Sequence, residues 1–159
     1  MSYALQPLLN IRLMREDRAS GELTAARQAA REAATAVADR KKELADYEST
    51  REERRDRIYD AIMGRAVTRE QIDLAQEGVA RIDEEGAIRL DNVHRAEGEL
   101  KKKEEAAEVA RAAFVFASKN RAKIEEHRTV WSIADAKEQE QRAEGELEDF
   151  VGRKQDIDD

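Results

Sequence analysis

The residues that this 159-residue chain lacks say most about its class. It contains no cysteine, one proline, one tryptophan and only three residues each of tyrosine and phenylalanine. Without cysteine there is no disulfide and no thiolate metal site. With a single proline, few positions interrupt a helix. The scarcity of aromatic residues deprives a compact core of its bulkiest members.

Large apolar side chains are also scarce. Hydrophobic residues make up 40% of the chain, but 27 of them are alanine, and charged residues make up 41%. A globular domain of this length would bury about two thirds of its unfolded surface, and it needs more large apolar side chains than this chain has. Such a composition fits either a disordered chain or an elongated helical structure with a narrow apolar seam. Because strong helix formers dominate the sequence, we predict helix.

Three further absences narrow the class of protein. No apolar run approaches the ~18 residues of a transmembrane span, so we expect no membrane insertion. The first residues lack a basic lead and a long apolar stretch, so they do not resemble a signal peptide, and a cytoplasmic location is expected. A formal net charge of −7 disfavours a general nucleic-acid-binding surface, so no nucleic-acid partner is expected.

No pattern typical of an active site occurs in the sequence. There is no Gly-rich phosphate loop, no nucleophile elbow and no histidine cluster at metal-ligand spacing. His94 and His127 are too far apart on one predicted helix to share a site, so we interpret each as a solvated or seam-edge histidine. The carboxylates lack the enclosed pocket that perturbs pKa values for acid–base chemistry. We therefore expect no enzyme activity, no cofactor and no metal.

The chain does contain a long heptad pattern. In its first half, two registers run side by side: Leu9, Glu16, Leu23, Ala30, Val37, Leu44, Arg51 and Ile58, and beside them Leu5, Arg12, Ala19, Ala26, Ala33, Arg40, Tyr47, Arg54 and Ala61. The second half carries Ile72, Val79, Gly86, Val93, Leu100, Ala107 and Phe114, and beside them Ala75, Ile82, Ala96, Ala110, Ala117, Ile124 and Trp131. A seam flanked by charges of both signs is typical of a coiled coil. The Arg and Glu residues within it predict thin, partly snorkelled packing.

Helix stop and start signals meet at residues 64–68. Gly64 suits the left-handed residue that ends many helices. Thr68 and Gln71 have the spacing of a capping box, which marks a helix start. We therefore predict a first helix over about 5–63, a turn at 64–68 and a second helix over about 69–150. The expected fold is all-α, with two long helices forming an antiparallel coiled-coil hairpin over residues 1–150.

With the turn centred near residue 66, the two helices can be paired residue by residue. The expected pairs are Ile58 with Leu74, Leu44 with Ile88, Leu23 with Val109, and Leu9 with Ile124. The second helix outruns the first beyond about Trp131, so residues 132–150 form an overhang with few apolar anchors. A frayed acidic tail is expected at 151–159. Gly78, Gly86 and Gly98 fall inside the second helix. They mark either a softened segment or a surface of close approach, or they are tolerated variation.

Charge and aromatic residues distinguish the two ends of the predicted hairpin. Residues 8–32 and 100–130, which meet at the open end, carry a net charge of about +4, whereas residues 33–99 carry about −5 and residues 131–159 carry −6. An aromatic and apolar group is expected to converge at the open end: Tyr3, Leu5, Ile124, Val130, Trp131 and Ile133. This group either binds a partner or closes the seam. The uneven distribution of charge either directs different partners to the two ends or has no role beyond that of a solvated charged surface.

Several short patterns occur together along nearly the whole chain. The first helix opens with spaced Leu and Arg residues and later contains Asp46-Tyr47, and the turn reads MGRAVT. The second helix contains Lys119 to Ile124, a lone Trp131 and a Glu-rich stretch from Glu138 to Asp149. This organisation resembles the YscO-like proteins of type III secretion and their flagellar FliJ relatives. The Trp followed by an acidic helix is closer to the virulence-type members than to the flagellar ones.

The resemblance implies a non-catalytic central stalk of a bacterial type III secretion system, similar in shape to the γ subunit of rotary ATPases. In such proteins the terminal helices enter the pore of the hexameric export ATPase, the other part of the hairpin reaches toward the export gate protein, and secretion chaperones are handled. The implied location is cytoplasmic, peripheral to the secretion apparatus at the inner membrane. The expected ATPase-facing residues at the open end are Leu9, Arg12, Arg15, Lys123, Arg128 and Trp131. Tyr47 falls on the seam, which argues against a role in contacting the gate.

Two other functions fit the same pattern. A generic coiled-coil scaffold would assemble some other machine. A holdase-type chaperone would grip unfolded clients with exposed apolar helix ends, as prefoldin-like hairpins do. Binding to one folded hexameric partner favours the stalk, whereas unspecific binding of unfolded clients favours the holdase.

Overall fold

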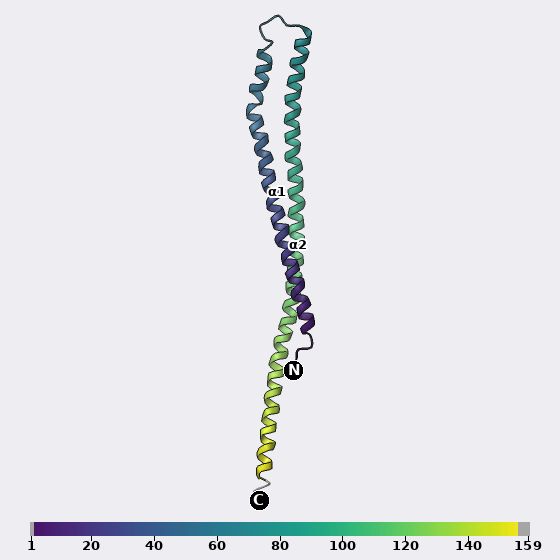
Figure 1. The fold of residues 1–159 in the computed structure, drawn as a ribbon, viewed down its shortest axis with the longest axis vertical. Coiled ribbons are helices and arrows are strands. Elements are labelled where there is room, and N and C mark those ends of the chain that lie inside the picture. The colour runs from purple at the N-terminus through teal and green to yellow at the C-terminus, as the bar shows by residue number, and fades with distance from the viewer. Residues whose placement is uncertain (1, 156–159) are drawn as a thin grey trace. The chain divides into compact units, whose positions relative to one another are not determined.

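Two long helices make up nearly all of the computed structural model, which describes the backbone of residues 2–155 and the side chains of residues 2–151. Helix α1 spans Gln6–Asp60 and helix α2 spans Arg69–Gln155 (Figure 1). No strand occurs within the described range. The protein is therefore all-α, and its two helices form a hairpin, as the heptad pattern predicts.

The turn between the helices begins earlier than the sequence pattern suggests. Helix α1 ends at Asp60, and the N–H of Ile62 then donates to the carbonyl of Tyr59 at 3.0 Å, which tightens the last turn. Gly64 follows with a φ of 70°, the left-handed conformation that glycine adopts without strain. At the other end, α2 continues to Gln155, and residues 156–159 of the expected frayed tail lie outside the described residues.

Thr68 and Gln71 form the predicted capping box. The Gln71 N–H donates to Thr68 Oγ1 at 3.2 Å, and the Thr68 N–H donates to Gln71 Oε1 at 2.9 Å. Two N–H groups that would otherwise lack partners are satisfied reciprocally. Glu70, in the first turn, interacts favourably with the helix dipole. Local side chains therefore define where α2 starts.

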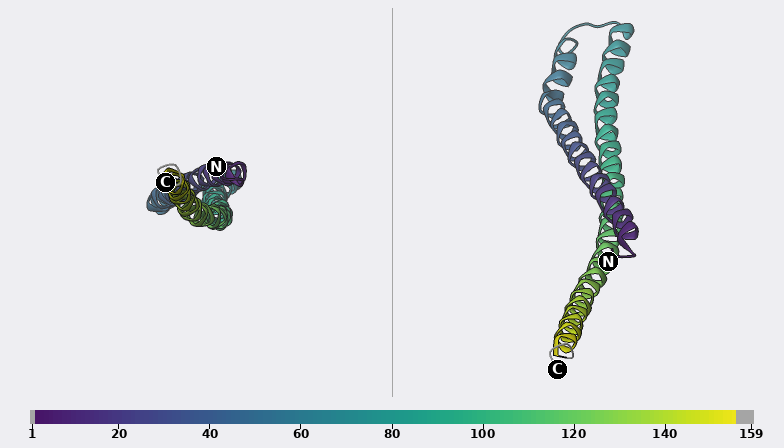
Figure 2. Two further views of the ribbon diagram at one scale, coloured as in Figure 1. Left: turned by 90° about the horizontal axis from the view of Figure 1, so that it is seen from below. Right: turned by 60° about the horizontal axis from the view of Figure 1, so that its bottom comes forward.

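Contacts divide the chain into two compact units. Unit 1 comprises Met1–Glu22 and Ala110–Asp159, and unit 2 comprises Leu23–Val109. Within unit 2 the two helical segments run side by side down from the turn (Figures 1 and 2). Cross-helix ion pairs join Lys41 to Glu97 at 2.9 Å and Arg51 to Asp83 at 2.6 Å. Residues later in α1 meet residues earlier in α2, which is the order of an antiparallel pair.

Burial follows the predicted seam. Every member of the first-helix register from Leu9 to Ile58 is buried or half-buried, and so are the positions named above for the second-helix seam from Ala75 to Trp131. Ile72, at the start of that seam, is exposed. In the companion register of α1, four further positions are exposed: Leu5, Arg40, Arg54 and Ala61. Among the described residues, the buried hydrophobic ones are Tyr3, Leu9, Ala19, Leu23, Val37, Tyr47, Ala75, Ile82 and Val93. The core is thin, as the Arg and Glu residues in the seam predict.

The residue pairs expected from distance to the turn include three partners that lie off the buried seam of α2. The expected partners in the second helix are all exposed: Leu74, Ile88 and Val109. Ile124 is half-buried, and it alone of the four lies on the heptad seam of α2. Distance from the turn sets the height of a residue along the helix but not the face on which it lies, because each residue is rotated by about 100° from the last. The heptad seam carries that angular information, and the structure follows the seam.

Tyr47 joins the two helices of unit 2. Its side chain is only 4% exposed, and its hydroxyl donates to the backbone carbonyl of Ile82. The guanidinium groups of Arg54 and Arg89 lie 5.2 and 4.2 Å from the ring centroid, within the range of cation–π attraction. The ring therefore packs between the helices while its one polar atom is satisfied.

At Gly78 and Gly86, side chains of α1 approach α2 closely. A methyl group at Gly86 would lie 3.3 Å from Cε1 of Tyr47, and one at Gly78 would lie 3.1 Å from Cδ1 of Ile58. Nothing lies within 4 Å of such a group at Gly98. The close-approach interpretation therefore holds for Gly78 and Gly86, and packing does not explain Gly98.

In unit 1 the start of α1 packs against the adjoining part of α2. Leu9 and Ala19 are buried there. Glu16 accepts a hydrogen bond from Nε of Arg121 at 2.5 Å across the two helices, and Arg121 also pairs with Glu125. Within the described residues beyond Trp131, no second helix runs beside α2 in Figures 1 and 2.

Acidification is expected to weaken the pair of Glu16 and Arg121. The hydrogen bond from Arg121 lowers the pKa of Glu16 below its ordinary value of 4.5, although burial acts in the opposite direction. A carboxylate whose pKa is lower in the folded state stabilises fully above its unfolded pKa and loses that contribution as the pH falls through its folded pKa. The wild type should therefore melt above Glu16→Gln at neutral pH, and the gap should shrink below about pH 4.

Thermal unfolding followed by circular dichroism at both pH values measures this gap. Glu22→Gln is the matched control, because Glu22 pairs with Arg18 on the exposed surface of α1, where ion pairs contribute little. A gap between wild type and Glu16→Gln that stays the same in acid would contradict the prediction.

Candidate partner-binding site

A small aromatic cluster closes unit 1 at the start of α1. The Tyr3 carbonyl accepts the N–H of Gln6 at 3.1 Å, which holds the residue against the first turn of the helix. The Tyr3 hydroxyl lies 2.7 Å from Nδ1 of His127, and its ring centroid lies 5.3 Å from that of Trp131. His127 and Trp131 are four residues apart on α2, so they share one face and both meet Tyr3.

The six predicted ATPase-facing residues differ in their access to a partner. Leu9 is 2% exposed, so its side chain belongs to the core of unit 1. Arg12 is half-buried, and its Nε is enclosed without a hydrogen-bond partner. Trp131 is also half-buried, whereas three cations are exposed: Arg15, Lys123 and Arg128. The accessible part of the predicted site is therefore the three exposed cations and the exposed part of Trp131.

Only part of the predicted aromatic and apolar group comes together. Tyr3 and Trp131 are in contact, and Ile124 is half-buried on the seam. Three other members are exposed: Leu5, Val130 and Ile133. The contact of His127 with Tyr3 is not apparent from the sequence. The only signal for it is the four-residue spacing of His127 and Trp131, which places both rings on one face of a helix.

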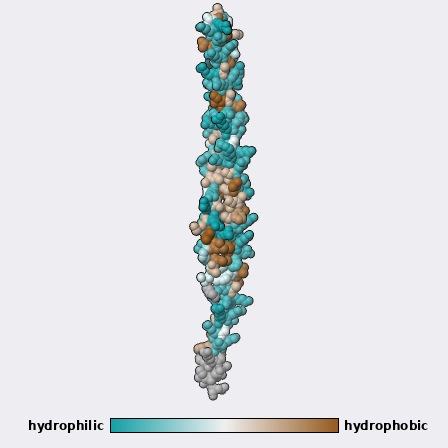
Figure 3. All heavy atoms as spheres, turned by 90° about the vertical axis from the view of Figure 1, so that its right-hand side faces the viewer, coloured by the Kyte–Doolittle hydropathy of each residue, from teal (hydrophilic) through white to brown (hydrophobic). Residues whose placement is uncertain are grey.

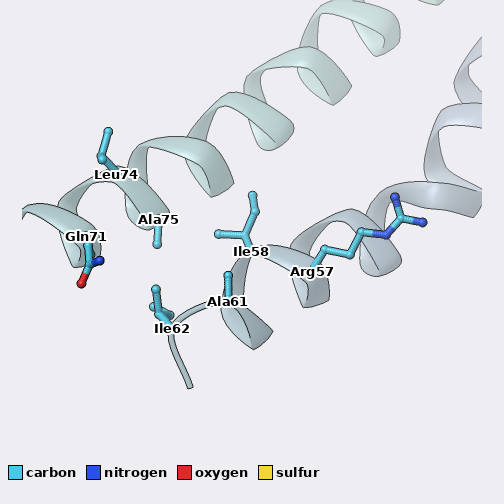
Figure 4. Close-up of a pocket in the computed structure, with 7 residues that line it drawn as sticks. All are labelled: Arg57, Ile58, Ala61, Ile62, Gln71, Leu74 and Ala75. Carbon is cyan, nitrogen blue, oxygen red and sulfur yellow. The ribbon is translucent and has the colours of Figure 1, made fainter. Parts of the chain in front are cut away.

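Unit 2 has a shallow, open groove beside the turn (Figure 4). It is lined by Arg57, Ile58, Ala61, Ile62, Gln71, Leu74 and Ala75. Ile58 and Ile62 point toward Ala75 across the groove, whereas Arg57 extends away from it. The floor of the groove is therefore apolar and could accept an apolar side chain of another protein.

The face shown in Figure 3 is mostly hydrophilic, with apolar patches between hydrophilic side chains. Among the described residues, no group of three or more His, Asp and Glu side chains could hold a metal ion. Within that same part of the chain, neither helix has a stretch apolar enough and long enough to cross a membrane. The features described above are suited to binding other proteins, through charge in unit 1 and through an apolar groove in unit 2.

Comparison with known protein families identifies the chain over nearly its whole length. The sequence matches the family model described as type III secretion protein YscO over residues 5–153. No curated protein and no solved structure matches the chain. The family match includes both α1 and almost all of α2.

Proposed function

The chain belongs to the YscO family of type III secretion proteins, and from this premise we propose that it is the non-catalytic central stalk that couples the export ATPase hexamer to the export gate. The match over residues 5–153 carries the proposal, because it spans both helices. On this proposal the protein works on the cytoplasmic side of the secretion apparatus, at the inner membrane. Its exposed helix surfaces are also available to secretion chaperones.

Unit 1 faces the ATPase in this proposal. Its exposed cations, including Lys123 and Arg128, attract an acidic pore lining, and the half-buried Trp131 anchors the contact. Exposed charge pairs are individually worth only about 0.2–1 kcal/mol, so each cation contributes little and their combined field steers the encounter. A contact of this kind is sensitive to salt.

Unit 2 faces the export gate in this proposal. The groove between Ile58, Ile62 and Ala75 offers the gate protein an apolar site beside the turn. Tyr47 takes no part, because it is buried between the helices. The two partners therefore use surfaces of different chemistry, one cationic and one apolar.

Charge reversal in unit 1 should weaken binding to the export ATPase. Lys123→Glu combined with Arg128→Glu is expected to reduce the affinity about tenfold, because two attractive contacts become repulsive. Trp131→Ala is expected to cost about 2 kcal/mol of binding free energy as the hot spot of the contact. Isothermal titration with the purified ATPase hexamer, or stimulation of its ATPase activity, measures both effects.

Matched variants distinguish binding through unit 1 from general effects of charge or of lost packing. Arg65→Glu combined with Arg69→Glu makes the same charge change beside the turn and should leave ATPase binding unchanged. Tyr3→Ala loosens the aromatic cluster but keeps the indole, so it controls for loss of packing around Trp131. If the turn variant abolishes binding while the unit 1 variant retains it, the orientation is wrong. Equal binding of any unfolded client protein by all variants would favour the holdase instead.

A further inference from the structure

Beyond Trp131, α2 carries a second apolar stripe on a different face. The hairpin seam, continued in register, reaches only polar residues and a glycine: Asp135, Glu138, Arg142 and Gly145. Apolar residues instead recur at alternating spacings of three and four, with one charged residue in step: Ile133, Ala136, Glu140, Ala143 and Leu147. Ile133 follows Trp131 by two positions, which is about 200° around the helix. The stripe is therefore not a continuation of the surface that packs on α1.

This stripe is open to solvent. Ile133 and Leu147 are 67% and 65% exposed, and the alanines between them are exposed as well. The register extends to Phe150, which is also largely exposed. Apolar anchors at helical spacing on one face of an exposed helix are the pattern by which helices enter grooves of partner proteins. The stripe thus has the form of a docking face.

The charge around the stripe indicates what kind of partner fits it. Residues 132–151 carry a net charge of −5, and Glu140 lies within the stripe itself. Of the two cations in this segment, Arg142 pairs with Glu138 on the same helix. A second copy of the chain would bring like charges together and would place Glu140 in an apolar interface, so self-association is disfavoured. A partner with basic residues around an apolar floor satisfies both features.

We propose that residues 133–147 of α2 dock as an acidic amphipathic helix into an apolar groove, rimmed by Lys and Arg, on a folded protein partner. The segment is about 21 Å long, which suits a groove on one protein domain. Glu140 then forms a charge-assisted hydrogen bond with a rim cation. This surface is separate from the cationic one that faces the ATPase in the stalk proposal, because it has the opposite charge and lies on the side of α2 away from Trp131.

The first experiment removes the apolar anchors without adding charge. The full-length protein is titrated against two probes from its own secretion system, the purified ATPase hexamer and the purified cytoplasmic domain of the export gate. Ile133→Gln combined with Leu147→Gln is expected to weaken binding to one of them at least tenfold. Val109→Gln is the control, because Val109 is 71% exposed and lies outside the stripe. Melting temperatures should not change, since all three side chains are exposed.

The second experiment separates a docking face from general electrostatic attraction. Glu144→Lys combined with Glu146→Lys reverses charges on the two flanks of the stripe. Glu148→Lys combined with Asp149→Lys makes the same charge change farther around the helix from the stripe. The first pair is expected to weaken binding more than the second at low salt, and the difference should shrink as salt is raised. Equal weakening by both pairs overturns the proposal.

Two further outcomes also overturn it. One is wild-type binding of both probes by the variant Ile133→Gln with Leu147→Gln. The other is sedimentation that shows a dimer dependent on these two residues, which would make a second copy the occupant. Neither outcome affects the stalk proposal, which is tested separately by the reversal of Lys123 and Arg128. The two proposals can therefore fail separately.

Discussion

Replacing Tyr47 with alanine is expected to lower the free energy of unfolding by about 3–5 kcal/mol, the range for removal of a large buried aromatic side chain. The ring is 4% exposed, and its hydroxyl satisfies a carbonyl of the opposite helix. Its loss leaves a cavity in a core that is one seam wide and has few neighbours to fill it. Tyr47→Phe keeps the ring and loses only the hydrogen bond, so it should cost about 1 kcal/mol. Denaturant unfolding followed by circular dichroism measures both values.

Glycine variants of α2 test the same contact from the other side. Gly86→Ala introduces a methyl group 3.3 Å from the Tyr47 ring, so crowding should offset its gain in helix propensity. Gly98→Ala meets open space and should stabilise by about 1 kcal/mol. Equal stabilisation by the two variants, or a small effect of Tyr47→Ala, would show that the ring is not packed against Gly86.

Leu9→Ala is expected to cost about 2–5 kcal/mol, with the thin packing of unit 1 favouring the low end. Leu9 is 2% exposed and lies in the part of α1 that packs against α2 within unit 1. Leu13→Ala is the matched control, because Leu13 lies one turn further along α1 and is exposed. The control should change stability by less than about 0.5 kcal/mol.

Hydrogen exchange should localise the effect of Leu9→Ala. Because the contacts of Leu9 lie in unit 1, amides of Ala110 to Trp131 should exchange faster, whereas those in unit 2 should change less. Uniformly faster exchange in both units would mean that the hairpin unfolds as a single cooperative element. That result would contradict the local effect predicted here.

The elements of the fold could be predicted because their signals are local. Gly64 ends the first helical region with a positive φ, and the capping box of Thr68 and Gln71 starts the second. Both devices depend on residues at most a few positions apart, so the sequence contains all the information they need. The heptad seam can be predicted for the same reason, because residues three and four positions apart in the sequence lie on the same face of a helix.

The candidate site was less predictable. Exposure of Lys123 follows from its place off the seam. Arg128 is exposed although the seam register continues through it, and the burial of Leu9, which lies on the seam, removes it from the accessible surface. The contact of Tyr3 with His127 joins residues 124 positions apart, and no local pattern encodes it. The stripe from Ile133 to Leu147 is visible in the sequence as a change of register, but its exposure depends on where the pairing with α1 stops.

By itself, the sequence determined that this protein is two long helices joined by a tight turn, which residues face the seam, and that the core is thin. These properties follow from helix propensity, capping and a repeat of three and four residues, all of which act between near neighbours in the chain. Only the tertiary structure decided which residues meet across the seam. Tyr47 reaches Gly86 and Ile82, and Ile58 lies over Gly78, because side-chain volume and the rotation of each helix set the final register. Neither quantity can be obtained by counting residues from the turn.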